Sequence, residues 1–243
     1  MPDWIKGRPF AHRGLFGPGV PENSLAAVGR AADLGFPVEI DVQASRDGRV
    51  VVFHDWKLDR LTGAAGRMDA ADFADLRRLR LQGTNEGIPL LEEVLELVNG
   101  RVAILVEIKN RRYVGKIEPG VAAALTAYNG SVAVQSFNPY TLGWFRIKYP
   151  HIRRGQLSCA FDTDDMAGWK KVILSVYGMN WMTRPNFLSH QWQRLPTPAT
   201  TFLHRVMGLP LLAWTAKSPA ELERALQLAD NAIFEGFLPE PHG

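Results

Sequence analysis

Short apolar runs alternate with helix-forming stretches along almost the whole chain, and this alternation limits the possible folds more than any other feature. Runs of this length bounded by turn residues are typical of buried strands. The run at 23–35 is instead helical in spacing, with Asn23 as a candidate cap and Gly35 as its end. Strands separated by helices predict a parallel sheet. The predicted strands are 8–11, 38–42, 49–53, 102–108, 132–137, 152–157, 178–182, 211–214 and 232–234.

Eight such strand–helix units in 243 residues favour a TIM-type (β/α)8 barrel, a single α/β domain over residues 1–243. An open, doubly wound sheet is the weaker alternative, because no Gly-x-Gly-x-x-Gly follows the first strand. The connection between 56 and 99 is too long for one helix. We predict a small inserted cap at 56–90, between the second strand and the second helix, with a helical stretch near 72–81. We expect the last barrel helix to be short or missing.

Composition excludes several classes of protein. The net charge of +3 is small and the basic residues are scattered, so we expect no nucleic-acid partner. Cys159 is the only cysteine, which excludes an intrachain disulfide and a thiolate metal cluster. No segment approaches the length of a membrane span, and the N-terminus lacks the apolar core of a signal peptide. We therefore expect a cytoplasmic protein with no stable membrane anchor; homo-oligomer formation is left open.

Two acids alternate with two apolar residues in the second predicted strand, Glu39-Ile40-Asp41-Val42. Side chains of a strand alternate between its faces, so Glu39 and Asp41 point the same way. Their like charges repel unless a positive group lies between them. Glu107, near the end of the 102–108 strand, can join them around one divalent ion. A ligand set made only of oxygens favours Mg²⁺ or Ca²⁺ over zinc.

Other chemically active side chains also fall at predicted strand ends, where the active site of a βα barrel lies. Arg13 and Lys109 can hold phosphate charge, and His12 and His54 can act as acid and base near neutral pH. Gln135 and Trp214 end later strands and are candidates for a substrate pocket. A metal, two cations and two histidines together indicate phosphoester hydrolysis.

Each residue taken alone has a simpler interpretation. His12 and His54 could be loop residues, paired acids on a strand usually face solvent, and Glu107 with Lys109 could form a surface salt bridge. Gln135 and Trp214 are more often core or loop residues. The combination is informative because independent surface residues would not all fall at the same end of successive strands.

The chain resembles the glycerophosphodiester phosphodiesterase family. The resemblance is carried by several stretches in order, with the first 110 residues matching closely and residues 150–210 matching little. Weaker motifs follow at Gln135-Ser136-Phe137-Asn138 and at Trp214-Thr215. The close matches are His12-Arg13-Gly14, Pro21-Glu22-Asn23-Ser24, Glu39-Ile40-Asp41-Val42, the run from Asp47-Gly48 to His54-Asp55, Leu58 to Gly63, Ile88 to Leu95 and Val106-Glu107-Ile108-Lys109.

The resemblance implies a TIM barrel whose acids Glu39, Asp41 and Glu107 hold one divalent ion. It implies acid and base roles for His12 and His54, phosphate contacts from Arg13 and Lys109, and cleavage of glycerophosphodiesters to glycerol 3-phosphate and an alcohol. The chain departs from the family pattern in its second half. Thr215-Ala216-Lys217 stands where Thr-Val-Asn is usual, and Phe234-Glu235-Gly236 where Thr-Asp is usual. These departures bear on the alcohol specificity.

Two other functions are compatible with the same residues. A lysophospholipase D-type or sphingomyelinase D-like phosphodiesterase acting on lipids would use the same centre with a more apolar mouth, which we would expect at 56–82 and 202–212. A binding protein without catalysis could keep the barrel and hold a phosphorylated ligand. The presence of all the expected polar residues argues against the binding protein.

Overall fold

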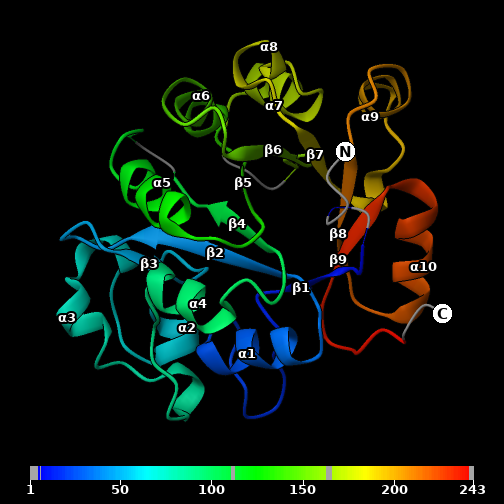
Figure 1. The fold of residues 1–243 in the computed structure, drawn as a ribbon. Coiled ribbons are helices and arrows are strands. Elements are labelled where there is room, and N and C mark those ends of the chain that lie inside the picture. Colours follow the sequence, from blue (N-terminus) through cyan, green and yellow to red (C-terminus); the bar gives the residue numbers. More distant parts are fainter. Residues whose placement is uncertain (1–4, 6, 111–112, 163–165, 241–243) are drawn as a thin grey trace.

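A closed barrel of parallel strands surrounded by helices forms the fold, which confirms the predicted architecture (Figure 1). The computed structural model describes residues 5, 7–110, 113–162 and 166–240. Within these residues, β1 and β9 pair with each other and close the ring. The ring runs in the order β1 (Phe10–His12), β2 (Val38–Ala44), β4 (Ile104–Ile108), β5 (Val132–Ser136), β6 (Arg153–Ser158), β7 (Phe187–Gln191), β8 (Leu211–Ala216) and β9 (Asn231–Phe234). A short strand, β3 (Val50–Val52), pairs antiparallel with β2.

Helices follow most of the strands and cover the outside of the barrel (Figure 1). Single turns of 3-10 helix at Met68–Ala70, Leu81–Gly83 and Trp192–Arg194 and a π-helical turn at Phe202–Val206 complete the elements. No helix in the described ranges is both long enough and apolar enough to cross a membrane. The α-helices are α1 (Leu25–Asp33), α2 (Asp59–Thr62), α3 (Phe73–Leu76), α4 (Leu91–Val98), α5 (Glu118–Ala127), α6 (Pro139–Lys148), α7 (Gly168–Ser175), α8 (Asn180–Thr183), α9 (Pro198–Thr201) and α10 (Pro219–Leu228).

The alternation of side chains along β2 sorts them between two cores. Val38, Ile40 and Val42 pack in the layer between strands and helices. Glu39 and Asp41 therefore point into the barrel, as the sequence pattern predicts. The barrel interior below them is filled by apolar side chains, among them Phe10, Leu105, Phe187 and Leu212. Each such burial stabilises the fold by about 1.5–3 kcal/mol, which offsets the cost of placing charges above it.

The segment between β3 and β4 carries a hydrophobic cluster of its own. Phe53, Leu61, Met68 and Leu76 are among its buried members. The segment therefore has a small core that is separate from the main one, and its description as an insertion stays a prediction. The predicted helix at 72–81 is wrong in length, because the α-helix covers only Phe73–Leu76 and the chain then turns.

The seventh barrel strand lies later in the chain than its sequence suggests. Residues 180–183, within the predicted strand at 178–182, form α8, and the strand is Phe187–Gln191. Ser189 and His190, on opposite faces of this strand, are polar but buried. A search for apolar runs therefore does not detect the strand. Trp181, in α8, is 73% exposed.

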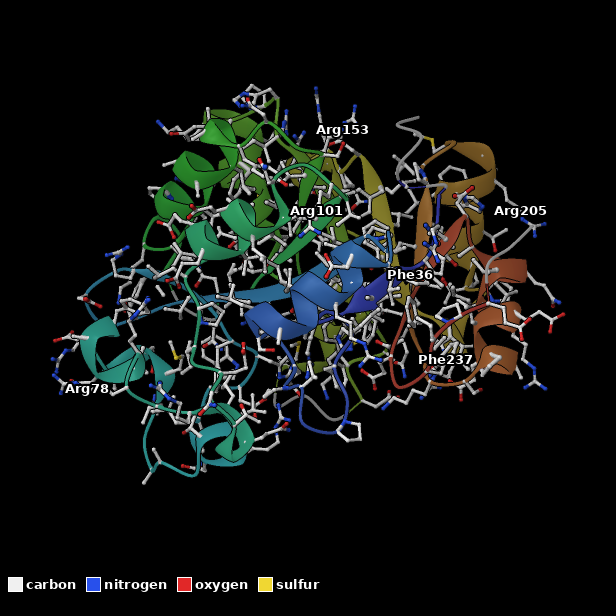
Figure 2. All side chains as sticks on the ribbon, turned by 60° about the horizontal axis from the view of Figure 1, so that its bottom comes forward. Phe36, Arg78, Arg101, Arg153, Arg205 and Phe237 are labelled. Atoms are coloured by element: carbon white, nitrogen blue, oxygen red, sulfur yellow. The ribbon has the colours of Figure 1, made fainter. Side chains whose placement is uncertain are left out.

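The basic residues are spread over the surface, as their scattering in the sequence predicts. Arg78, Arg153 and Arg205 lie far apart at the periphery of the molecule (Figure 2). After β9, no helix follows within the described residues up to 240. The N-terminal residues behind the signal-peptide argument lie partly outside the described ranges.

Gly14, which follows His12 and Arg13, is required by its surroundings. Its φ is +80°, and a Cβ there would lie 2.6 Å from the backbone carbon of Ala27. Both strain and clash oppose any larger residue. We expect Gly14→Ala to lower the free energy of unfolding by about 2–4 kcal/mol in urea titration. Gly17→Ala is the control, because open space surrounds it, and it should change stability by less than about 0.5 kcal/mol.

Candidate active site

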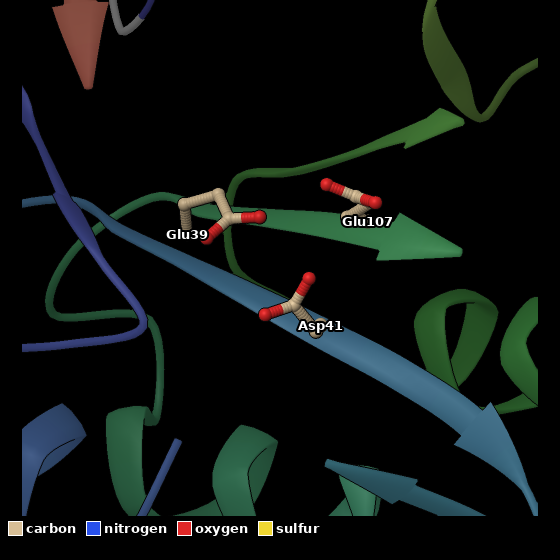
Figure 3. A group of neighbouring side chains, drawn as sticks. All are labelled: Glu39, Asp41 and Glu107. Carbon is tan, nitrogen blue, oxygen red and sulfur yellow. The ribbon is translucent and has the colours of Figure 1, made fainter. Parts of the chain in front are cut away.

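Three buried acids meet at the carboxyl ends of β2 and β4. Asp41 and Glu107 are register partners in the two neighbouring strands, and Glu39 lies one inward position earlier on β2. One oxygen from each of Glu39, Asp41 and Glu107 lies within 4.8 Å of the others (Figure 3). Exposed fractions are 1%, 1% and 9%. The structure thus brings together the three acids that the sequence singles out, in a group that could hold a metal ion.

The charges around these acids are only partly compensated. Although burial opposes ionisation, the charges of Lys109, His54 and Arg13 lower the pKa of Asp41 below its ordinary range. Glu39 behaves differently, because burial and then the charges of Asp41 and Glu107 raise its pKa well above the ordinary value. One carboxylate of the three therefore lacks an adequate positive partner. An oxygen-rich site with an uncompensated buried charge fits a hard divalent cation.

Arg13 and Lys109 contact the acids. The Lys109 ammonium lies 2.9 Å from Glu107 Oε1 and 3.3 Å from Asp41 Oδ1. Arg13 Nε lies 3.0 Å from Asp41 Oδ2, and its backbone N–H donates to Glu39 Oε2 at 3.3 Å. Arg13 adopts a left-handed φ of +55°, which is uncommon for a residue with a side chain. Both predicted phosphate-binding cations are therefore next to the acidic cluster.

Asn23 has a different role from the predicted one. The N-cap of α1 is Ser24, whose Oγ accepts a hydrogen bond from Ala27 N at 3.1 Å. Asn23 instead donates from Nδ2 to Asp41 Oδ2 at 3.0 Å and accepts from the Asp41 backbone N–H at 3.2 Å. A left-handed φ of +56° turns it toward β2. The Pro-Glu-Asn-Ser stretch thus fixes the orientation of one of the three acids.

His12 is held between two carboxylates. Its Nδ1 is 2.5 Å from Glu235 Oε2, and its Nε2 is 3.9 Å from Glu39 Oε2. Lys217 Nζ lies 3.0 Å from the other Glu235 oxygen. The His12 contact, more than the opposing burial, lowers the pKa of Glu235 to about 2. In the sequence, Glu235 stands out only as a departure from the family pattern, and nothing there points to its contact with His12.

His54 is anchored through a chain of ion pairs that leads back to Arg13. His54 Nδ1 is 2.6 Å from Asp55 Oδ1, and Arg60 Nε is 2.6 Å from Asp55 Oδ2. Arg60 also binds Glu22 at 2.7 Å, and Glu22 binds Arg13 at 2.6 Å. Burial lowers the pKa of His54. Sequence analysis missed Arg60 and gave Glu22 no role, although both lie in the matching motifs.

Gln43 is a further residue that sequence analysis missed. It is the next inward position of β2 after Asp41, and it is 1% exposed. Its Nε2 donates to three consecutive carbonyls, those of Phe53, His54 and Asp55, at 2.8–2.9 Å. This contact fixes the backbone that carries His54. The period-two pattern that reveals Glu39 and Asp41 points to Gln43 as well.

A large cavity opens beside the acidic cluster. Its volume is about 850 Å³, and His54, Glu107 and Lys109 belong to its lining. The rest of the wall comes mainly from the loops after β4, β5 and β6 and from α7. Of the segments at which we expected an apolar mouth, 56–82 contributes Trp56 and Lys57, and 202–212 contributes nothing within the described residues. Exposed apolar side chains do lie in the second segment, at Phe202, Val206 and Met207, but they are not part of this cavity.

Gln135 and Trp214 lie near the cavity but are not part of its lining. Gln135 pairs in register with Glu107 and is 1% exposed. The Gln135 Oε1 and Trp214 Nε1 atoms are buried and have no hydrogen-bond partner in the described part of the chain. The Trp214 ring packs edge-on against Phe137, with 5.8 Å between ring centroids, and Phe137 lines the cavity. Two buried polar atoms thus remain to be satisfied.

Acids, imidazoles and cations gathered at the carboxyl ends of barrel strands define the class of this protein as a TIM-barrel enzyme. The model of the glycerophosphoryl diester phosphodiesterase family matches residues 12–237. A glycerophosphodiester phosphodiesterase from Caldanaerobacter subterraneus subsp. tengcongensis is 36% identical over 237 residues, which cover 92% of this chain and 91% of that protein. The chain therefore belongs to the glycerophosphoryl diester phosphodiesterase family, as its motifs suggest.

Solved structures agree with this assignment. A glycerophosphodiester phosphodiesterase from Thermotoga maritima has a TM-score of 0.69 and 27% identity, covering 93% of this chain and 92% of its own. A phosphodiesterase from Oleispira antarctica, solved with its product sn-glycerol-3-phosphate, has a TM-score of 0.78 at 23% identity, covering 94% and 92%. The second likeness shows the shared fold alone.

Glu235 offers a test of how His12 is held. We expect Glu235→Gln to lower kcat by about 10- to 100-fold with little change in KM, because the imidazole loses its orienting charge. Glu235→Asp should restore part of kcat. The pKa of Glu235 in the folded protein is about 2, below the ordinary value of 4.5. The Glu235 carboxylate therefore stabilises the wild type fully at pH values above 4.5, and this stabilisation is lost as the pH falls through about 2. Equal kcat in Glu235→Gln and wild type would contradict the role.

Proposed function

We propose that this protein is a metal-dependent phosphodiesterase that hydrolyses glycerophosphodiesters to glycerol 3-phosphate and an alcohol. The observation that carries the proposal is the meeting of three buried acids, with oxygens within 4.8 Å of one another, between His12 and His54. The family assignment supplies the substrate class. Neighbouring family members named as glycerophosphodiester phosphodiesterases support the same reaction.

Glu39, Asp41 and Glu107 would hold the divalent ion, Mg²⁺ or Ca²⁺. The donor set fits, because it contains only carboxylate oxygens and retains an uncompensated charge at Glu39. When bound, the ion neutralises phosphate charge and polarises a phosphoryl oxygen. Arg13 and Lys109 lie within reach of the same space and would bind the remaining phosphate oxygens, with Arg13 able to make a two-pronged contact.

The two histidines would divide the proton transfers. His12, beside Glu39 and backed by Glu235, would take the proton of the attacking oxygen. His54 lines the cavity, and it would give a proton to the leaving alcohol. The attacking oxygen is that of water or of the neighbouring glycerol hydroxyl, and trapping of a cyclic phosphate distinguishes the two routes.

Gln135 and Trp214 would receive the glycerol half of the substrate. An amide oxygen accepts from one hydroxyl, and an indole N–H donates to another. Both atoms are buried without a partner within the described residues. A glycerol with two free hydroxyls offers a donor for the amide oxygen and an acceptor for the indole N–H.

Product analysis with a panel of glycerophosphodiesters tests this function. We expect release of glycerol 3-phosphate with an added divalent metal, and loss of at least about 100-fold of that activity in EDTA. Mg²⁺ and Ca²⁺ are added back separately to identify the metal. A micellar lysophospholipid is the comparison substrate, and its preferential cleavage would replace the proposal by the lipid-acting alternative. Unchanged activity in EDTA would refute the metal dependence.

A further inference from the structure

The cavity beside His54 has a chemical character of its own, distinct from that of the acidic cluster. We propose that it receives the alcohol half of the substrate and selects alcohols with an uncharged apolar body over alcohols with a positive charge. This inference rests on the proposed function, because it names the leaving group of that reaction. Specificity here would be set by α7 and by described residues that follow β5 and β6, such as Phe137 and Phe161.

The wall of the cavity is apolar and aromatic. Phe137, Phe161, Trp169, Ile173 and Met179 contribute to it. Phe137 and Phe161 pack edge-to-face with 6.0 Å between their centroids. A volume of about 850 Å³ is large for ethanolamine or glycerol and suits an alcohol with a bulky body. Such a wall favours ligands that bury apolar surface against it.

Two uncharged polar side chains in the wall, those of Ser136 and Asn138, are already engaged within the protein. Ser136 Oγ donates to the Ile108 carbonyl at 2.7 Å. Asn138 donates to the Asn110 carbonyl at 3.1 Å and accepts from Tyr140 N at 3.0 Å. These groups offer little to a ligand rich in hydroxyls. The partnerless Gln135 and Trp214 atoms lie outside this lining, so the glycerol half is better satisfied there, and the cavity is left for the alcohol.

The charges at the cavity disfavour a cationic alcohol. Among the described residues that line it, the acids Asp55 and Glu107 are paired with Arg60 and Lys109. Lys57 and Lys170 also line it, and neither forms an ion pair with a carboxylate of the described residues.

Aromatic faces can bind quaternary ammonium groups, so the rings alone do not decide the preference. At the Trp169 ring, that position is already taken, because Lys170 Nζ lies 5.5 Å from the ring centroid. An incoming cation would meet a like charge at the most exposed ring of the wall, and this repulsion separates alcohols of equal size.

An isosteric pair of substrates tests the inference. Glycerophosphocholine is compared with the diester of 3,3-dimethylbutanol, in which carbon replaces the quaternary nitrogen at the same size. Glycerol 3-phosphate release gives kcat/KM for each. We expect the uncharged substrate to be preferred by about tenfold or more. Equal values or a preference for choline would overturn the inference while leaving the proposed function intact. Failure to hydrolyse either substrate would overturn both.

Substitutions in the wall of the cavity test which residues produce the substrate preference. The double variant Lys57→Gln, Lys170→Gln should raise kcat/KM for glycerophosphocholine and reduce the preference by about fivefold or more. Trp169→Ala should raise KM for the dimethylbutyl diester. Trp181→Ala is the matched control, because Trp181 is also exposed but lies on α8 and does not line the cavity. An unchanged preference in the lysine double variant, or equal effects of the two tryptophan variants, would contradict the assignment.

Discussion

Glu39→Gln is expected to abolish metal binding without harming the metal-free fold. Burial and the charges of Asp41 and Glu107 raise the pKa of Glu39, so the neutral amide relieves an unfavourable charge. At a metal concentration of 100 times Kd, the wild type should gain about 2.7 kcal/mol, or about 5–10 °C in Tm. The variant should gain none at the same concentration. Its phosphodiesterase activity should fall by about 100-fold or more.

Thermal unfolding with EDTA and with added metal measures this difference directly. Glu92→Gln is a suitable control, because it removes a glutamate charge from the exposed face of α4. It should keep both the activity and the metal-induced shift. A metal-induced Tm shift of wild-type size in Glu39→Gln would show that this carboxylate is not a ligand.

His12→Ala and His54→Ala should each lower kcat by about 10²- to 10⁴-fold for diesters of alkyl alcohols. The two variants should differ when the leaving group is 4-nitrophenol, which departs without a proton. His54→Ala should then recover most of its activity, because His54 is the proposed donor to the leaving group. His12→Ala should remain impaired, because deprotonation of the attacking oxygen is still needed.

Neither substitution should prevent metal binding, because the group of side chains that could hold the ion consists of three carboxylates and includes no histidine. The metal-induced Tm shift therefore checks that each variant is folded and loaded. His151→Ala, at an exposed position after α6, should behave as wild type. Activity of both variants at wild-type level on alkyl diesters would end the acid–base assignment. Loss of the metal-induced shift would instead place the histidine among the ligands.

The fold could be predicted where the pattern of polar and apolar residues matches the faces on which they lie in the barrel. Val38 to Val42 shows a clear period of two, and the polar residues on its inward face are the functional ones. β7 was missed because Ser189 and His190 interrupt its apolar pattern, although both are buried. The preceding stretch around Trp181 is more apolar, yet it forms a short helix at the surface. Local apolarity did not predict the strand here, because contacts with distant segments determine which of these residues are buried.

The candidate site was predictable for residues that lie directly at strand ends. Its supporting residues were less so, because their roles depend on contacts between distant segments. Glu235 reaches His12 across 223 positions of the chain, and Arg60 reaches Glu22 across 38. The cavity wall from α7 was also missed, since the helix has no buried residue and reads as an ordinary surface element. Only the packed barrel brings these groups together.

Lys109 and Arg13 have a consequence for how the protein matures. Their charges already lie against Asp41 and Glu107 in the protein alone, so a large part of the repulsion among the acids is compensated before any ion arrives. We therefore expect the metal-free polypeptide to reach its folded state. The cell's supply of divalent ions would then govern how many finished molecules are active, rather than how many molecules survive.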